Sequence, residues 1–344
     1  MHSTLVGGAV LNVRTLQRQL AGLLPEARTV DGESTLELTT QGNDAPRLVS
    51  ATVLEGDRMQ AHPVPGAGVV SLSEAKDDGG PCAPGFRAFL DGTQRSQVFY
   101  VDRVPVVLGT VAAVVRERRD RRMHTWESPL IRSRLYVSRR FLGEHAWSRI
   151  SGAYGDALVD TTDGVPDIIS HPYALCDAAV QRVKSHREQV ERRLAERWCD
   201  TESDALFLDG GISGSERVAT SALAVGVVKS HRTLYAEGDG LDVVMALEHH
   251  ERSSVFSVTS SRRTTVASWY LRMRDHRGHD PMWGLVRAEV AQLESSQMAH
   301  IGARADEVSR WILAEASPLA LPDGRWDKMV YGVRDCEEYL RAIQ

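Results

Sequence analysis

The chain has 344 residues, of which 42% are apolar and 25% are charged, as is usual for globular proteins. Its formal net charge is −5, which gives no sign of a uniformly basic protein, and no apolar run is long enough to span a membrane. The first residues do not resemble a signal peptide, and the four cysteines form no Cys-x-x-Cys pair. We therefore expect a cytoplasmic location, and neither a zinc site nor a disulfide framework.

Positive charge is concentrated in two stretches of the chain. Residues 116–140 contain nine arginines against three acidic residues, a local charge of +6. Residues 262–277 contain five arginines against one aspartate, or +4, so the remainder carries −15. Clustered arginine on an acidic body suits a groove that follows a phosphate backbone. The alternative is that these runs are solvated faces of helices.

The first eighty residues are predicted to form an N-terminal α+β extension. Apolar residues at helical spacing predict a helix over residues 11–24, which ends before a proline. Residues 35–38 and 48–54 have the composition of strands. A loop rich in Gly, Pro and Asp follows over residues 62–84 and is the best candidate for a boundary. The extension then comprises residues 1–80, and a core domain comprises residues 85–344.

The core domain is predicted to alternate strands and helices. Segments 89–91, 97–101 and 106–115 predict an antiparallel meander, with a break at Pro105. Residues 152–166 are typical of a loop, and residues 172–198 have the strongest helical pattern of the chain. The later predicted elements are strands at 205–209, 222–228, 254–258 and 267–273, a strand running into a helix at 282–293, and helical segments at 241–247, 301–315 and 334–343.

Two apolar runs of this core end in an Asp-Gly pair, at residues 86–92 and 205–210. Bounded by turn residues and followed by further apolar runs, they indicate buried strands. A carboxylate at a strand end is held by rigid backbone, so Asp91 and Asp209 on neighbouring strands would offer four oxygens to a hard divalent cation. The alternative is an ordinary turn, since Asp-Gly occurs at five other places in the chain.

These two strands, with Gly226-Val227-Val228-Lys229-Ser230-His231 after the second, resemble the NurA family of nucleases, and the stretch from Val330-Tyr331 adds to the resemblance. The resemblance covers roughly residues 85–344. It implies an α/β fold with an RNase H-like mixed sheet flanked by helices, and DNA degradation with Mn²⁺ or Mg²⁺. It also implies a homodimer that works with a HerA-like hexameric ATPase, in DNA end processing and repair or in defence against phage DNA.

The family completes its metal site with an acidic residue on the helix before the second strand. Glu191 stands at about the corresponding distance before Asp209, and Glu188 lies one turn earlier on the same face. The resemblance therefore implies Asp91, Asp209 and Glu191 as metal ligands. The alternative is that these two glutamates and Glu196 of the same helix simply pair with neighbouring arginines.

The C-terminus departs from the family pattern. The family ends with a Tyr-Pro pair and a later His on the last helix, whereas Tyr331 is followed by Gly and the last predicted helix has no His. We expect Glu338 to supply the fourth carboxylate, because hard cations prefer oxygen ligands. Glu337, Glu289 and His300 remain alternatives for this position.

Nucleic-acid contacts are expected near the second Asp-Gly strand and near the second arginine-rich stretch. Lys229 ends a strand, where it can meet a phosphate as a point charge or act as a surface residue. Arg272 and Arg274 flank an aromatic pair that includes Trp269, a mixture that suits base stacking with backbone contacts. The alternative is that Trp269 is a core residue. Tyr331 completes the expected set.

The sequence thus predicts a divalent-metal-dependent deoxyribonuclease in which water, activated by the cation, attacks the phosphodiester. Its predicted catalytic residues are Asp91, Asp209, Glu191 and Glu338. Two alternatives stay open. One is another RNase H-like nuclease, such as an Argonaute-type slicer or a resolvase. The other, favoured by the missing terminal His, is a non-catalytic subunit that binds DNA or an ATPase.

Overall fold

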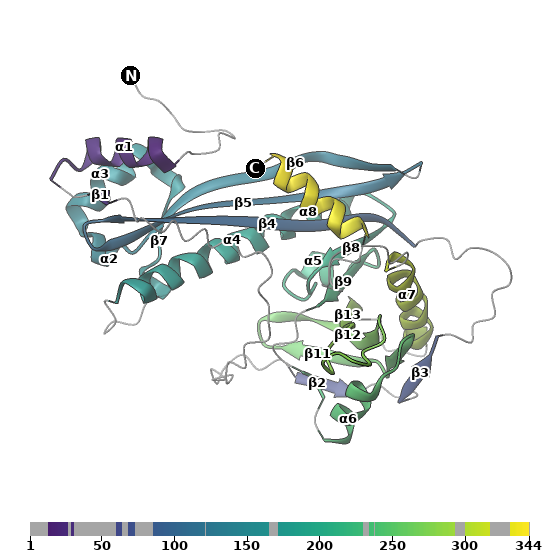
Figure 1. Ribbon diagram of the computed structural model, residues 1–344. Coiled ribbons are helices and arrows are strands. Elements are labelled where there is room, and N and C mark those ends of the chain that lie inside the picture. Colours follow the sequence, from purple (N-terminus) through teal and green to yellow (C-terminus); the bar gives the residue numbers. More distant parts are fainter. Residues whose placement is uncertain are drawn as a thin grey trace.

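One large mixed sheet runs through the whole molecule (Figure 1). The computed structural model describes residues 13–26, 29–30, 60–63, 68–72, 85–120, 122–164, 171–229, 234–236, 238–292, 300–316 and 331–343. In this part of the chain the sheet has 13 strands, and its main path is β2-β11-β12-β13-β9-β8-β4-β5-β6-β7. No described helix is both long and apolar enough to cross a membrane.

The centre of the sheet combines an antiparallel meander with two parallel strands. Strands β4 (Phe86–Val101), β5 (Val104–Arg119) and β6 (Arg122–Val137) form an antiparallel meander. On the other side of β4, strands β8 (Ala205–Asp209) and β9 (Ala224–Val228) run parallel to it and to each other. The continuous apolar run in β5 is buried on both faces, as expected for a central strand. The predicted mixed α/β architecture is therefore confirmed.

The other half of the sheet is antiparallel and includes strands from the N-terminal region. Strand β9 pairs with β13 (Leu285–Ala291), which is followed by β12 (Arg263–Arg272), β11 (Phe256–Ser260) and β2 (Gln60–Pro63). Three short strands pair outside this path: β1 (Thr29–Val30) on β4, β10 (Glu251–Ser253) on β12, and β3 (Val69–Ser71) on β10. At the opposite end of the path, β7 (Leu158–Asp160) pairs with β6. The described N-terminal strands thus belong to the same sheet as the core.

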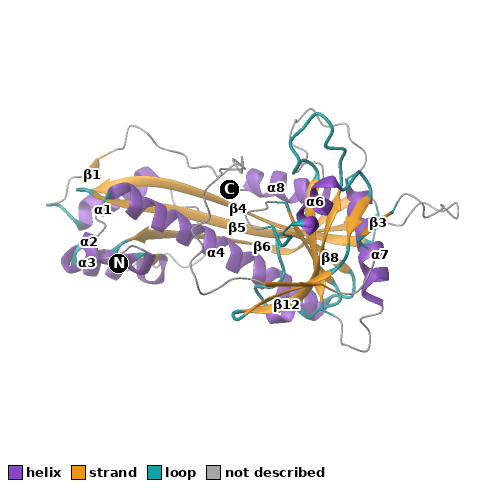
Figure 2. Cartoon of the chain, turned by 90° about the horizontal axis from the view of Figure 1, so that it is seen from below, coloured by secondary structure: helices purple, strands orange, loops and turns teal. Residues whose placement is uncertain are grey.

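Helices cover both faces of the central strands. Helix α4 (Pro172–Thr201) lies along one face, and α7 (Ile301–Glu315) and α8 (Tyr331–Ile343) pack on the other (Figures 1 and 2). Helix α4 buries a stripe that includes Val183, Val190, Leu194 and Trp198, which accounts for its helical apolar spacing. The short helices α5 (Glu216–Ala219) and α6 (Asp239–Ala246) follow β8 and β9 respectively.

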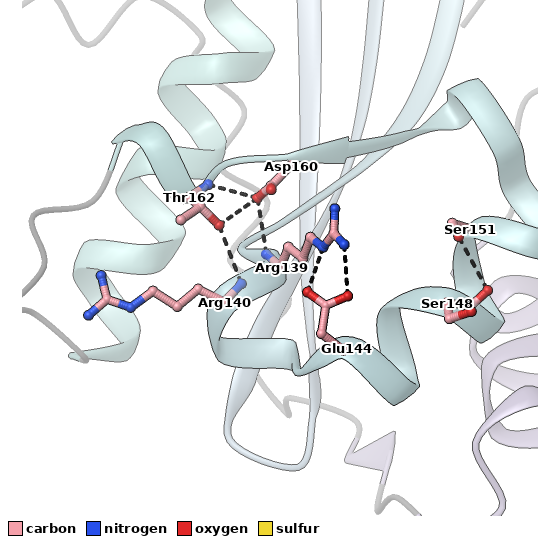
Figure 3. Close-up of polar contacts among 7 residues, drawn as sticks. All are labelled: Arg139, Arg140, Glu144, Ser148, Ser151, Asp160 and Thr162. Carbon is pink, nitrogen blue, oxygen red and sulfur yellow. Dashed lines mark hydrogen bonds and ion pairs between the residues drawn. The ribbon is translucent and has the colours of Figure 1, made fainter.

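The far end of the β4–β6 meander is covered by small helices. Helices α1 (Val13–Leu23), α2 (Arg139–Leu142) and α3 (Glu144–Tyr154) gather there with the 3₁₀ turns η1 (Gly155–Ala157) and η2 (Thr162–Gly164). Asp160 links the end of β7 to the starts of α2 and η2. Its Oδ1 accepts hydrogen bonds from the backbone N–H groups of Arg139 and Thr162 and from the Thr162 hydroxyl. Arg139 also forms a two-bond ion pair with Glu144 (Figure 3).

Several local predictions are wrong because tertiary pairing overrides local composition. The expected loop at 62–84 contains strand β3, and the expected loop at 152–166 contains β7 between two 3₁₀ turns. The segment at 282–293 forms strand β13 and no helix within its described residues. The arginine-rich run at 116–140 lies mostly on strands β5 and β6, so the alternative that it forms solvated faces of helices is wrong. The strands expected at 35–38 and 48–54 lie outside the described residues.

Candidate functional site

Asp91 and Asp209 occupy neighbouring positions on paired strands. Leu90 on β4 is in parallel register with Leu208 on β8, so the residues that follow them are adjacent. Paired strands lie about 4.8 Å apart. The predicted convergence of the two aspartates on adjoining strands is therefore confirmed, while their role as metal ligands stays a prediction.

The two Asp-Gly pairs have different local structures. Asp209 ends β8, as expected, and the following Gly210 has a φ of 138°. Asp91 does not end a strand, because it pairs with Val114 and Gly92 pairs with Ala113 in the middle of the long hairpin. The turn interpretation of Asp91-Gly92 is therefore wrong. The Asp91 carboxylate instead accepts a hydrogen bond from the Gly92 N–H at 2.8 Å.

Gly92 has a packing role that the turn interpretation missed. A Cβ atom at this position would collide with the carboxylate of Glu191, which reaches the strand from α4. The missing side chain therefore lets the glutamate approach the backbone next to Asp91. Asp91 shares a face of β4 with Phe89, which packs in the core under α8, so Asp91 and Glu191 approach residues 91–92 from opposite sides of the strand.

The carboxylates of this cluster interact electrostatically. Burial raises the pKa of Asp91 well above its usual range, and the negative charges of Asp209 and Glu191 raise it further, while Lys229 opposes the shift. Burial also raises the pKa of Glu191 to about 7, where Asp209 acts in the same direction and Arg187 opposes it. Mutual destabilisation of ionised carboxylates is characteristic of sites that are built to receive positive charge.

Two cations of the chain neutralise part of this charge. The Lys229 Nζ lies 2.7 Å from Asp209 Oδ2. The Arg187 Nη1 lies 2.6 Å from Glu191 Oε1, one helical turn away, and donates a longer hydrogen bond of 3.3 Å to the Gly92 carbonyl. Sequence reasoning treated Arg187 only as a neighbouring charge, although its (i, i+4) spacing to Glu191 is visible in the sequence.

Helix α8 brings Glu337, and not Glu338, toward Asp91. The charge of Glu337 contributes to the raised pKa of Asp91, although its side chain also pairs with Arg341. The Glu338 side chain is 59% exposed and pairs with Arg334. Glu338 does not join the cluster in this arrangement, because it lies on the solvent side of the helix.

The other two alternatives for a fourth ligand also lie outside the cluster. Glu289 is 1% exposed and is held by Arg287 at 2.6 Å and by the Ile212 N–H at 2.7 Å. It thereby anchors the turn that follows Asp209 to strand β13. His300 is exposed at the start of α7.

The predicted nucleic-acid contacts have mixed outcomes. Arg272 is fully buried and donates hydrogen bonds to four backbone carbonyls of the loops around β12. The prediction that it contacts nucleic acid is therefore wrong. Arg274 is half-buried and donates to the Ala316 carbonyl. Trp269 is fully buried, as expected if it is a core residue, and its Nε1–H donates a hydrogen bond to the Ser309 hydroxyl. The side chain of Tyr331 lies outside the described part of the structure.

The arginine-rich run is largely engaged within the protein. Arg116 bonds Asp335 of α8, and Arg118 forms a two-bond pair with Glu315 of α7, so both tie β5 to the C-terminal helices. A cavity of about 330 Å³ near this run is lined by Arg87, Glu117, Arg118, Arg119, Asp120 and Asp204. Three basic and three acidic residues line it, and none belongs to the carboxylate cluster, so it is not a continuation of that site.

The candidate ligands offer the oxygen atoms that a hard divalent cation prefers, but their side chains are not arranged around a common point. Asp91, Asp209 and Glu191 supply carboxylate oxygens, which such ions prefer. Within the described ranges, however, no group of three or more His, Cys, Asp or Glu side chains is arranged to hold a metal ion. Two features account for this: Asp91 and Glu191 approach the strand from opposite sides, and Lys229 and Arg187 engage oxygens of Asp209 and Glu191.

Comparisons with known proteins find similarity among solved structures. No family model and no curated protein matches the sequence. Among solved structures, the chain is similar to the crystal structure of the NurA nuclease from Sulfolobus solfataricus, with 9% sequence identity and a TM-score of 0.40. The likeness covers 83% of this chain and 86% of that chain.

Proposed function

We propose that the chain is a divalent-metal-dependent nuclease that hydrolyses phosphodiester bonds of DNA. The observation that carries this proposal is the cluster of Asp91, Asp209 and Glu191, three interacting carboxylates contributed by β4, β8 and α4. Burying several like charges together is costly, so such a cluster needs a function that offsets the cost. RNase H-like strand order at the same place adds support.

In this proposal each residue has a defined role. Asp91, Asp209 and Glu191 would hold the cation, and Glu337 replaces Glu338 as the candidate for a fourth carboxylate because its charge acts on Asp91. When bound, Mn²⁺ or Mg²⁺ supplies an activated water and offsets charge on the phosphate. Lys229, next to Asp209, orients the scissile phosphate as a point charge.

The resemblance to NurA nucleases also suggests how the nuclease works in the cell. We propose a cytoplasmic homodimer that acts with a HerA-like hexameric ATPase, which would feed DNA into the nuclease. DNA end processing in repair and defence against phage DNA are both consistent with this activity. A pull-down of the chain with an ATPase encoded next to it tests the partnership directly.

Asparagine substitutions of the two strand aspartates test the catalytic proposal. D91N and D209N keep side-chain size but remove the negative charge that a cation requires, so both variants are expected to lose at least about 100-fold in Mn²⁺-dependent DNA hydrolysis, like other losses of electrostatic stabilisation. D156N, which changes an exposed aspartate on η1, is the matched control and should retain parental activity. Equal hydrolysis by D91N and the parent would exclude Asp91 from catalysis.

A non-catalytic subunit is the second candidate function. It is favoured by the absence of a preassembled three-ligand group among the described side chains and by the lack of a histidine on α8. On this alternative the chain would bind DNA or the ATPase without hydrolysis. A purified parent chain that binds DNA but releases no nucleotides with Mn²⁺ or Mg²⁺ would support it.

A further inference from the structure

The carboxylate cluster contains counter-ions supplied by the chain itself. Arg187 pairs with Glu191, and Lys229 pairs with Asp209, at 2.6 Å and 2.7 Å respectively. Both cations are largely withdrawn from solvent, because the side chains of Arg187 and Lys229 are only 22% and 17% exposed. These pairs are therefore less weakened by water and salt than ordinary surface ion pairs.

Arg187 has the more restricted position of the two. It lies on the 30-residue helix α4, one turn before Glu191, so the helix itself sets the spacing between the two side chains. Its Nη1 also donates to the Gly92 carbonyl at 3.3 Å, which ties the guanidinium to the strand that carries Asp91. The guanidinium is thus placed between Glu191 and the strand that carries Asp91.

Arg187 engages the Glu191 oxygen that faces the strand carrying Asp91. Glu191 Oε1 accepts the hydrogen bond from Arg187 Nη1, and this oxygen lies against Gly92, beside Asp91. An ion that binds this oxygen would be placed within a few ångströms of a positive group, where like charges repel strongly in a partly buried site. Binding of the ion through this oxygen therefore requires the Arg187 pair to break.

We infer that Arg187 is a built-in counter-ion that competes with the divalent cation for Glu191. The pair neutralises the glutamate while the site lacks a cation, and it lowers the affinity of the site for the ion. This inference rests on the proposed function, since it takes Glu191 as a metal ligand. It also gives a physical reason why no three-ligand group is assembled in the described residues.

Mn²⁺ binding to the full-length chain without DNA tests the inference independently of activity. Free Mn²⁺ is measured by EPR during titration of the parent, R187M, R187K and R193M. R187M keeps the aliphatic length but removes the charge, and we expect it to bind Mn²⁺ roughly tenfold more tightly, which corresponds to loss of a competing pair of about 1.4 kcal/mol. R187K retains a competing charge and should bind like the parent.

R193M is the matched control, because it removes an exposed arginine from the same helix. If R193M tightens Mn²⁺ binding as much as R187M does, the effect is one of net charge and the inference is overturned. Equal or weaker binding by R187M, with parental circular dichroism, also overturns it but leaves the nuclease proposal standing. R187Q replaces R187M if that variant does not fold. Absence of Mn²⁺ binding by the parent and all variants overturns both the inference and the proposed function.

Discussion

At the scale of single residues, the candidate site depends on two residues whose contacts differ from the roles considered for them in the sequence. Gly92 leaves room for the Glu191 carboxylate, and Glu289 holds the Ile212 N–H in the turn after Asp209. Neither residue offers chemistry to a substrate. Gly92 allows the Glu191 carboxylate to approach the strand, and Glu289 fixes the turn next to Asp209. Both residues act through packing and hydrogen bonding.

A buried histidine on α4 gives a prediction about pH at the same scale. His186 is 9% exposed, and its Nδ1 accepts a hydrogen bond from the Tyr136 hydroxyl at 2.7 Å if the imidazole is neutral. Burial lowers the pKa of His186 to about 4, and the charges of Arg134, Arg182 and Arg193 lower it further. In the unfolded chain the pKa would be close to 6.5. Between pH 4 and pH 6.5, the unfolded state therefore binds a proton on His186 that the folded state does not bind.

We expect His186 to contribute stability that is complete above pH 6.5 and is lost as the pH falls toward 4. Between pH 7 and pH 5 the free energy of unfolding should decrease by about 1–2 kcal/mol through this residue. Urea unfolding of the parent and of H186N at the two pH values measures the contribution as a difference. An identical loss of stability in both proteins would show that His186 does not carry it.

At the scale of elements, the strand that carries Asp91 is held between two helices. Helix α4 packs on one face, while α8 packs on the other, with Gly332 against the ring of Phe89. Cys336 of α8 donates to the Phe89 carbonyl at 3.3 Å. Arg116 of β5 adds an ion pair with Asp335. The position of α8, and with it Glu337, therefore depends on close contact with β4.

Enlarging the contact residue of α8 should displace the helix. In G332A the added methyl group would collide with the Phe89 ring, so we expect a loss of about 1–3 kcal/mol in stability, as for other overpacked cores. Nuclease activity should fall as well, since Glu337 moves with the helix. Chemical unfolding and DNA hydrolysis measure the two effects.

The matched control is G302A on α7. A methyl group at Gly302 would meet no atom within 4 Å, and alanine favours the helix, so stability should be unchanged or rise by up to about 1 kcal/mol. Equal stability of G332A and G302A would contradict the close packing of α8 on β4.

At the scale of the whole molecule, the N-terminal region is part of the sheet. Strand β2 pairs with β11, β3 pairs with β10, and β1 pairs with β4. Helix α1 buries Leu16 and Leu20 in the apolar cluster at the far end of the meander. Strand pairing thus crosses the predicted boundary between the N-terminal extension and the core domain.

Removal of residues 1–80 should therefore damage the core. The deletion leaves the edges of β10 and β11 unpaired and uncovers the apolar cluster under α1. We expect a lower Tm and concentration-dependent aggregation, measured by thermal unfolding and light scattering. Deletion of residues 1–12 alone keeps every described element and serves as the control. A monodisperse truncated chain with the parental Tm would mean that the core is independent of this region.

Periodicity allowed most elements to be predicted, and tertiary pairing decided the others. The helical patterns at 172–198 and 301–315 correspond to α4 and α7, because an amphipathic helix buries one regular stripe wherever it packs. The short N-terminal strands and β7 were missed, because their partners are distant in the sequence. Composition alone did not distinguish such edge strands from loops.

The sequence by itself determined the apolar strands and the long helix, since each has a local pattern, and its two Asp-Gly pairs singled out Asp91 and Asp209 as candidates, whereas Glu191 was implied by the resemblance to NurA nucleases. Only the tertiary structure decided which charges meet. It paired β4 with β8, brought Arg187 and Lys229 onto the carboxylates, buried Arg272 and turned Glu338 toward solvent. The physical reason is that electrostatic interactions and burial depend on distances in space, which local sequence spacing does not contain.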